Sequence, residues 1–275
     1  MEDGTFDVRI TSQCFLLFLF EVMGTTFLVL AINFLDHHPL YVGCGIFMGI
    51  MVAGKRTGGH FNFGVTIGVY LMKRKWIGNL KAVLIYFLAE LTGVYLAMLL
   101  SLGFLGKDNI QRFRPADMSF NWAYVMFIEF FFTFTFHSVI MHSKIDKVSL
   151  FDNMVLGAAS VMGAIYFSIK CCGDRFTGAV LNPTIGLGNL TFVAMVDDSG
   201  DGLKYLPSYF FGPLLGGACA GLFCSLVSDR FVPEKPEENK QIDPRVTYSR
   251  DFFRPYTVSN DRQTETIEQQ EPLVK

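Results

Sequence analysis

Long apolar stretches constrain the fold of this chain more than any other feature. A helix needs about 20 apolar residues to cross the roughly 30 Å hydrocarbon core of a bilayer. Six stretches qualify, at residues 12–35, 39–54, 80–105, 119–141, 149–169 and 207–229, of which 39–54 is the shortest and rich in glycine. We therefore predict an all-α membrane protein with six transmembrane helices.

Composition and charge agree with a membrane protein. Hydrophobic residues make up 51% of the 275 positions, and the net charge of −2 does not indicate a nucleic-acid partner. Charged residues are sparse from 13 to 230 and dense beyond. We divide the chain into an N-terminal cytoplasmic segment, 1–11, a membrane domain, 12–230, and a cytoplasmic tail, 231–275, which we expect to be disordered.

The sequence indicates neither an enzyme nor a metal or other cofactor. Four of the six cysteines lie in apolar stretches, and the Cys171–Cys172 pair is expected in a loop. No Cys/His spacing resembles a zinc site. The apolar stretches hold no carboxylate–His or Ser–Lys arrangement that would favour catalysis or ion coupling.

Two further apolar segments, 61–72 and 182–194, are too short to span a bilayer. Each follows a glycine-containing turn and an Asn, in "TGGHFNFGVTIG" (57–68) and "FTGAVLNPTIGLG" (176–188). Lipid cannot satisfy the hydrogen bonds of an open backbone, so such segments must be buried in protein or re-entrant. We predict two re-entrant half-helices.

The two halves of the chain repeat each other. Glu-x-x-x-Thr occurs at 21–25 and again at 129–133, and Asn62 and Asn182 occupy equal places. "AELTG" at 89–93 corresponds likewise to "GPLLG" at 212–216. The repeats cover about 12–105 and 119–230. Each contains three spans, so the second enters from the opposite side, which gives inverted repeats.

Lys and Arg in the loops favour both termini in the cytoplasm. With the N-terminus inside, nine of these residues lie inside and six outside. The inner set is Arg9, Lys55, Arg56, Lys73, Arg74, Lys75, Lys81, Lys144 and Lys147, and the outer set is Lys107, Arg112, Arg114, Lys170, Arg175 and Lys204.

The half-helices carry the chemistry. Asn62 and Asn182 precede helical segments as N-caps do, and Pro183 suits the first helical position. Two helix N-termini meeting at the midplane make a positive centre that repels cations, while the Asn amides can donate hydrogen bonds to a neutral solute. The alternative is that each Asn only caps its helix and nothing passes.

These residues resemble the aquaporin/aquaglyceroporin (major intrinsic protein) family. Its usual motifs are SGxHxNPAVT and TGxxxNPAR, where this chain has "GGHFNFGVT" and "TGAVLNPTI". The resemblance covers residues 12–230 and implies six tilted helices with two half-helices, a homotetramer, and passage of water and small neutral solutes through each protomer. Most members lie in the plasma membrane.

The chain departs from both family motifs. Phe63-Gly64 replaces Pro-Ala after Asn62, and Thr184 replaces Ala after Pro183. The resemblance implies that the two prolines normally pack together at the midplane. We expect the Phe63 ring to fill that contact, with Gly64 supplying space. A ring turned the other way would narrow the pore.

A further departure concerns the outer constriction. Ile185 stands where the family usually has Arg, and spacing carries the other constriction positions over to Val42, Ala179 and, less directly, Ala164. This apolar set suggests glycerol, urea, ammonia or hydrogen peroxide as solutes besides water or in its place. Because hydrophobic rings resist wetting, a poorly conducting structural or junctional protein is the alternative.

Three further residues have roles that the resemblance implies. Glu21 and Glu129 would accept hydrogen bonds from the loops that carry the half-helices, with proton relay as the alternative. His60 would pack between loop and helix, with pH sensing as the alternative.

Overall fold

The computed structural model describes residues 11–73, 76–144, 149, 153–197 and 200–228, and the helices in these ranges are joined without any strand. The α-helices are α1 (Thr11–Phe34), α2 (Pro39–Thr57), α3 (Phe63–Lys73), α4 (Trp76–Leu105), α5 (Trp122–Lys144), α6 (Met154–Cys172), α7 (Pro183–Val196) and α8 (Leu206–Phe223). Shorter turns are η1 (Lys107–Asn109), η2 (Gly173–Thr177), η3 (Asp201–Tyr205) and η4 (Cys224–Ser228). The predicted tail, 231–275, and most of segment 1–11 lie outside the described residues.

The helices correspond to the predicted spans with shifted ends. Five of them are long and apolar enough to cross a membrane, whereas α2 is 19 residues long but falls short of the same apolar criterion. Its four glycines and the Lys55-Arg56 pair lower its hydropathy. The half-helices are α3 and α7, both apolar and shorter than a span.

The expected loop around Cys171–Cys172 is wrong. Both cysteines belong to the last turn of α6, which continues to Cys172 and is followed by the π-helical turn η2. Cys172 is fully buried, and this burial holds the extra turn against the core. Both thiols are free.

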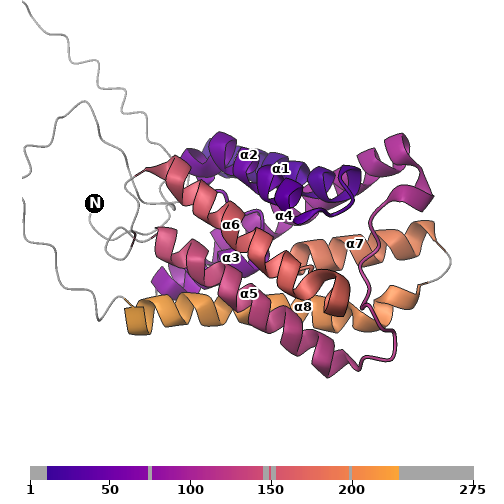
Figure 1. The fold of residues 1–275 in the computed structure, drawn as a ribbon. Helices are drawn as coiled ribbons and strands as arrows, with labels where there is room; N and C mark the ends of the chain where they lie inside the picture. The colour runs from indigo at the N-terminus through magenta and orange to yellow at the C-terminus, as the bar shows by residue number, and fades with distance from the viewer. Residues whose placement is uncertain (1–10, 74–75, 145–148, 150–152, 198–199, 229–275) are drawn as a thin grey trace, which may run out of the picture.

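The bundle is built from two interlocked halves (Figure 1). The most extensive contacts join α1 to α4 and α5 to α8, which are equivalent pairs in the two repeats. Each half-helix also packs on the long helix of the other repeat, α3 on α8 and α7 on α4. In Figure 1, α3 and α7 lie end to end near the middle of the bundle, as two re-entrant helices from opposite faces must.

The recurring Glu-x-x-x-Thr motif has a packing explanation. A Cβ added to Gly93 in α4 would lie 2.8 Å from Thr25 Cβ, and one added to Gly216 in α8 would lie 2.8 Å from Thr133 Cβ. Neither threonine hydroxyl has a hydrogen-bond partner among the described residues. The threonines are therefore packing residues, small enough to let α1 approach α4 and α5 approach α8 closely at a glycine.

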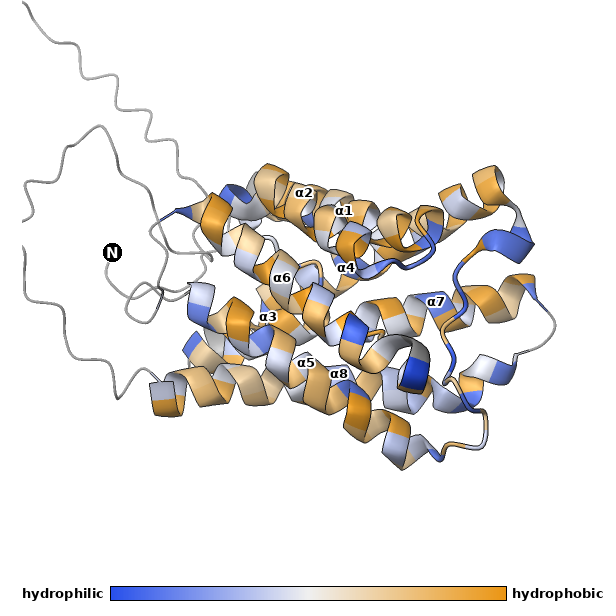
Figure 2. Ribbon diagram, in the orientation of Figure 1, coloured by the Kyte–Doolittle hydropathy of each residue, from blue (hydrophilic) through white to orange (hydrophobic). Residues whose placement is uncertain are grey.

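The outside of the bundle is apolar, as a lipid-facing surface requires. Large exposed side chains include Phe104, Met195, Phe15, Leu80 and Trp122. Hydrophilic residues gather at the helix ends and in the connections, most visibly in the segment between α4 and α5 (Figure 2). Apolar side chains therefore fill the core and also cover the outside of the helices, which suits contact with lipid.

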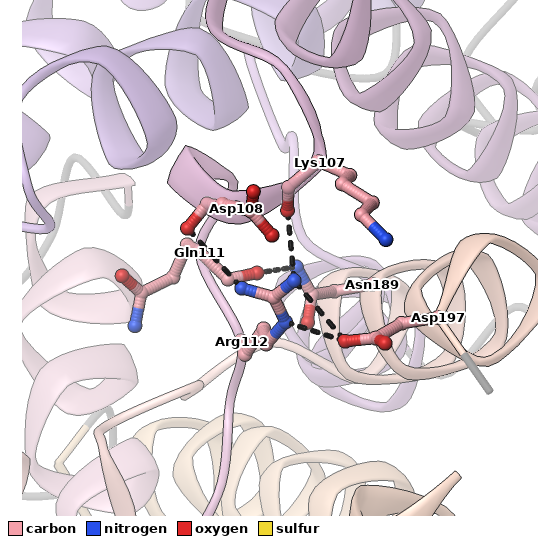
Figure 3. Close-up of polar contacts among 6 residues, drawn as sticks. All are labelled: Lys107, Asp108, Gln111, Arg112, Asn189 and Asp197. Carbon is pink, nitrogen blue, oxygen red and sulfur yellow. Dashed lines mark hydrogen bonds and ion pairs between the residues drawn. The ribbon is translucent and has the colours of Figure 1, made fainter. Parts of the chain in front are cut away.

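The connection between α4 and α5 is tied down at the outer end (Figure 3). The Arg112 guanidinium pairs with Asp197 at 3.1 Å and donates to the Lys107 carbonyl at 2.8 Å. Asn189 of α7 donates from Nδ2 to the Gln111 carbonyl at 2.8 Å. These contacts fix the end of α7 and use Arg112 for structure rather than as a free charge.

Helix proximity predicts the result of two glycine substitutions. In Gly217→Ala, the added Cβ would lie 2.1 Å from the Gly64 carbonyl oxygen, which is backbone and cannot move aside. Overpacking of this kind costs about 1–3 kcal/mol or more. The matched control Gly163→Ala meets nothing within 4 Å, so it should be neutral or stabilising by up to about 1 kcal/mol. Thermal unfolding in detergent measures both. Equal Tm values for the two variants would contradict this packing.

Candidate pore and outer constriction

The two half-helices begin at asparagines that cap them. Asn182 has an extended backbone, and its Oδ1 accepts from the backbone N–H groups of Thr184 and Ile185. Asn62 Oδ1 accepts from the Gly64 N–H at 2.9 Å. The side-chain oxygens thus satisfy helix N–H groups that would otherwise lack a partner.

The amide nitrogens of the same asparagines tie the two repeats together. Asn62 Nδ2 donates to the Leu181 carbonyl at 2.9 Å, and Asn182 Nδ2 donates to the Phe61 carbonyl at 2.8 Å. Each carbonyl belongs to the loop before the other half-helix. An amide nitrogen carries two hydrogens, so each of these bonds leaves a second N–H that a solute can use.

Two buried glutamates hold the loops before the half-helices. Glu21 accepts from the backbone N–H groups of His60 (3.2 Å) and Phe61 (2.9 Å). Glu129 accepts in the same way from Val180 (3.1 Å) and Leu181 (2.8 Å). These bonds are the ones expected of the two glutamates from the sequence.

Hydroxyl groups complete the same pattern in both loops. Thr57 donates to Glu21 and accepts from the Gly59 N–H, and Thr177 donates to Glu129 and accepts from the Ala179 N–H. Tyr86 and Tyr209 donate to the carbonyls of these two threonines. Each loop partner lies 120 positions from its counterpart, so the duplication extends to single hydrogen bonds.

The loops adopt a backbone that only such a network can maintain. Phe61, Ala179 and Leu181 have φ angles of 50°, 55° and 52°, in the left-handed region that disfavours side chains. Phe61 fits because three glycines surround its ring, Gly24, Gly49 and Gly59. Strained loops of this kind persist where their surroundings determine them fully.

A narrow cavity lies between the asparagines and His37, which follows α1. Both Asn62 and Asn182 line it, together with Val42, Ala179 and Ile185. The volume open to the centre of a water molecule is about 10 Å³, enough for about one. The remaining lining residues are Leu28, Ile32, His37, Ile46, Phe136, Ile165, Ile169, Val180 and Leu181.

Comparison with known proteins identifies the family. The family model described as "Major intrinsic protein" matches residues 12–224. The chain belongs to the major intrinsic protein family. It is thus a passive membrane channel of the kind that carries water and small solutes.

Individual relatives and one solved structure agree with the family model. An aquaglyceroporin of Plasmodium falciparum is 29% identical, over 76% of this chain and 83% of its own. Aquaporin TIP2-3 of Arabidopsis thaliana is 30% identical over 64% of this chain and 66% of its own. An X-ray structure of the aquaglyceroporin from Plasmodium falciparum, 22% identical, has a similar fold with a TM-score of 0.69, covering 80% of this chain and 98% of that one.

The altered first motif of this major intrinsic protein places the Phe63 ring outside the cavity lining. The Phe63 ring packs on Phe87 of α4, with centroids 4.8 Å apart, and it is not among the cavity-lining residues. Gly64 makes room for other groups, because a Cβ there would lie 2.7 Å from His137 Cε1 and 3.0 Å from the Pro213 carbonyl. Phe63 therefore does not narrow the cavity, and the expectation that its ring fills the midplane contact, with Gly64 supplying space, stays a prediction.

The residues carried over for the outer constriction divide into two groups. Val42, Ala179 and Ile185 line one cavity, but Ala164 is not among its lining residues. One residue further along α6, Ile165 turns into the cavity, as does Ile169 one turn later. Lys170 and Arg175 are exposed and do not line it.

His60 and Thr184 both join a buried hydrogen-bond chain. The His60 ring stacks on Tyr86, with centroids 4.2 Å apart, and its Nδ1 lies 2.9 Å from Thr66 Oγ1. Thr184 Oγ1 lies 2.7 Å from Asn182 Oδ1. Pro183 is buried at the start of α7, the N-terminal position in which a missing N–H costs nothing.

Sequence reasoning missed two residues of the site. Glu90 lies fully buried between the half-helices, although "AELTG" served only to align the repeats. An ionisable residue inside a span is itself a functional signal, and it would have found Glu90. His37 lines the outer cavity and contacts Phe113 edge-on, but nothing in its local sequence marks it.

The loop hydrogen bonds predict equal effects of two substitutions. Each glutamate accepts backbone N–H groups with both of its oxygens. A Gln side chain has only one acceptor oxygen, so its NH2 group would face a backbone N–H, donor against donor. Each of Glu21→Gln and Glu129→Gln should lower stability by about 1–3 kcal/mol. The control Asp201→Asn is exposed and should change little. Thermal unfolding tests the three variants. If either Glu21→Gln or Glu129→Gln left the unfolding temperature unchanged, the two loops would not be held equivalently.

Proposed function

We propose that this protein conducts glycerol, urea, ammonia or hydrogen peroxide, besides water, through the cavity between its half-helices. The observation that carries the proposal is that Asn62 and Asn182 line the same cavity as an apolar outer group, Val42, Ala179 and Ile185. The asparagines offer N–H donors at the midplane. The apolar group offers contacts to the carbon side of a solute such as glycerol.

Ion exclusion in this proposal comes from the backbone. The cavity-lining residues carry no carboxylate, Lys or Arg. The N-termini of α3 and α7 direct partial positive charges at the centre. A cation would meet these dipoles after losing its hydration shell, at a cost that nothing in the lining repays.

The outer constriction determines which neutral solutes pass. We place Val42, Ala179, Ile185 and Ile169 there, with Ile169 in the position that the sequence analysis gave to Ala164. An Arg at position 185 would donate hydrogen bonds to water and fill more of the constriction, whereas Ile is smaller and has no donor. His37 supplies the one titratable side chain of the lining.

The second candidate function is a structural or junctional role with poor conduction. The small, apolar cavity favours it, since a hydrophobic constriction can gate a pore by dewetting. Both candidates require the same scaffold, so only transport measurements separate them.

The proposal extends to assembly and topology. We propose a homotetramer in which each protomer has its own pore, in a plasma membrane, with both termini in the cytoplasm. The charge distribution in the loops supports this orientation, and the family resemblance supports the tetramer. We propose no catalytic activity.

Stopped-flow light scattering of proteoliposomes tests the channel. Water, glycerol and urea gradients should each relax faster than in protein-free vesicles of the same lipid. Permeability equal to empty vesicles for every solute, from monodisperse folded protein, would eliminate conduction and leave the structural role.

The variant Ile185→Arg tests the constriction. The guanidinium would enter the outer cavity, and an added barrier of about 1.4 kcal/mol for a bulky solute lowers its flux about tenfold. We expect glycerol and urea permeability to fall by that factor while water permeability falls less. Leu203→Arg, exposed in η3, is the matched control. Unchanged glycerol and urea fluxes would place the constriction elsewhere.

A further inference from the structure

A third buried carboxyl group, that of Glu90, lies between the two half-helices. Glu90 is fully buried in α4. Its Oε1 accepts from Thr66 Oγ1 of α3 at 3.0 Å, and its Oε2 lies 3.2 Å from Thr184 Oγ1 of α7. One carboxyl group therefore contacts both half-helices of the pore.

The hydrogens around Thr184 determine the protonation of this carboxyl group. Thr184 has one hydroxyl hydrogen and two oxygen neighbours, Asn182 Oδ1 at 2.7 Å and Glu90 Oε2 at 3.2 Å. Both would be acceptors if Glu90 were ionised. One contact would then bring two oxygens together without a hydrogen between them, in a buried site where no water screens them.

Rotating the Asn182 amide does not resolve this conflict. Its oxygen must face the N–H groups of Thr184 and Ile185, and its nitrogen must face the Phe61 carbonyl. A rotated amide would put donor against donor and acceptor against acceptor. The hydrogen that is needed must come from Glu90.

A neutral Glu90 satisfies its contacts with both threonines, and as a carboxylic acid it can still accept from the Asn62 backbone N–H. Its Oε2–H donates to Thr184, and the Thr184 hydroxyl donates to Asn182 Oδ1. On the other side, Thr66 donates to Oε1, and His60 Nδ1–H donates to Thr66 across 2.9 Å. One unbroken chain of donors then runs from the loop before α3 to the cap of α7.

Neighbouring charges agree with a neutral Glu90. Glu21 of α1 lies near enough to act on Glu90 electrostatically. Glu21 accepts bonds from Thr57, His60 and Phe61, which is the pattern of a carboxylate. Two adjacent buried carboxyl groups do not both ionise readily. Glu90 forms no ion pair with a Lys or Arg among the described residues.

This chain of hydrogen bonds is not part of the duplicated scaffold. The places equivalent to His60, Thr66 and Glu90 in the second repeat hold Val180, Gly186 and Pro213. The bonds by which Glu21 and Glu129 hold the loops occur in both repeats, but the hydrogen-bond chain through Glu90 occurs once. It adds a constraint on Asn182 that folding of the repeat does not require.

We propose that Glu90 is a neutral carboxylic acid that positions the Asn182 amide in the pore through Thr184. As a neutral group it also leaves the positive centre made by the helix N-termini uncompensated, whereas a carboxylate there would attract cations. Its effect on permeation rests on the proposed function, but its protonation state does not.

Infrared spectroscopy tests the protonation state independently of transport. A protonated carboxyl group has a carbonyl stretch well separated from the carboxylate bands. The difference between wild type and Glu90→Gln in liposomes at neutral pH should show the loss of one protonated carboxyl band. Loss of a carboxylate band instead would overturn the proposal, whether or not the protein conducts.

Permeability measurements test the positioning role. Gln can donate to Thr184 and accept from Thr66, so Glu90→Gln should retain wild-type water permeability. Glu90→Ala and Thr184→Val, which break the chain, should lower it about tenfold, the effect of one lost hydrogen bond. Thr92→Val, on the exposed side of α4, is the matched control. Loss of permeability in Glu90→Gln, or no loss in Thr184→Val, would refute the role. If even the wild type does not conduct, the proposed function fails while the infrared result still decides the state of Glu90.

Discussion

The structure depends on two short loops whose backbone N–H groups have no water to bond. Each loop enters the membrane interior in order to start a half-helix, and lipid offers no acceptors there. Glu21 and Glu129 supply those acceptors from neighbouring helices. With the N–H groups satisfied, the carbonyls of Phe61 and Leu181 are free to bind the asparagine of the opposite repeat. The two repeats are therefore bonded to each other at the centre of the pore, and the surrounding helices pack around these central bonds.

Duplication explains the scaffold and the asparagine pair, but not every contact of the site. Loop acceptors, threonine hydroxyls, tyrosine hydroxyls and glycine crossings recur in both halves, at spacings of 108, 120, 123 and 123 positions. The buried chain of hydrogen bonds from His60 through Glu90 to Asn182 occurs once among the described residues. The symmetric positions hold the scaffold and the asparagine pair of the cavity, whereas the contacts that single out Asn182 lie where the two repeats differ.

The sequence predicted what periodicity and hydrogen-bond chemistry determine. The spans, the half-helices, the inverted repeat and the loop role of the glutamates follow from apolar length, unsatisfied backbone and recurring motifs. Side-chain direction does not follow in the same way. Phe63 turns to Phe87 because α4 offers an aromatic partner, and Gly64 is small because His137 and Pro213 approach from other helices. Ala164 does not line the cavity, whereas its neighbour Ile165 and, one turn later in α6, Ile169 do, and spacing alone could not distinguish these positions.

The lack of a cationic filter residue is consistent with this arrangement. An Arg at the outer constriction adds a positive barrier to the one at the midplane, so its replacement by Ile185 leaves exclusion to the half-helix dipoles alone. That barrier is weakened by any negative charge at the midplane. Glu90 lies there, against Thr66 and Thr184. A chain without the Arg can tolerate a carboxyl group in this place only if the group stays neutral, and the hydrogen-bond chain that fixes Asn182 is also what keeps the proton on Glu90. Under the proposed function, cation exclusion therefore depends on Glu90 remaining neutral.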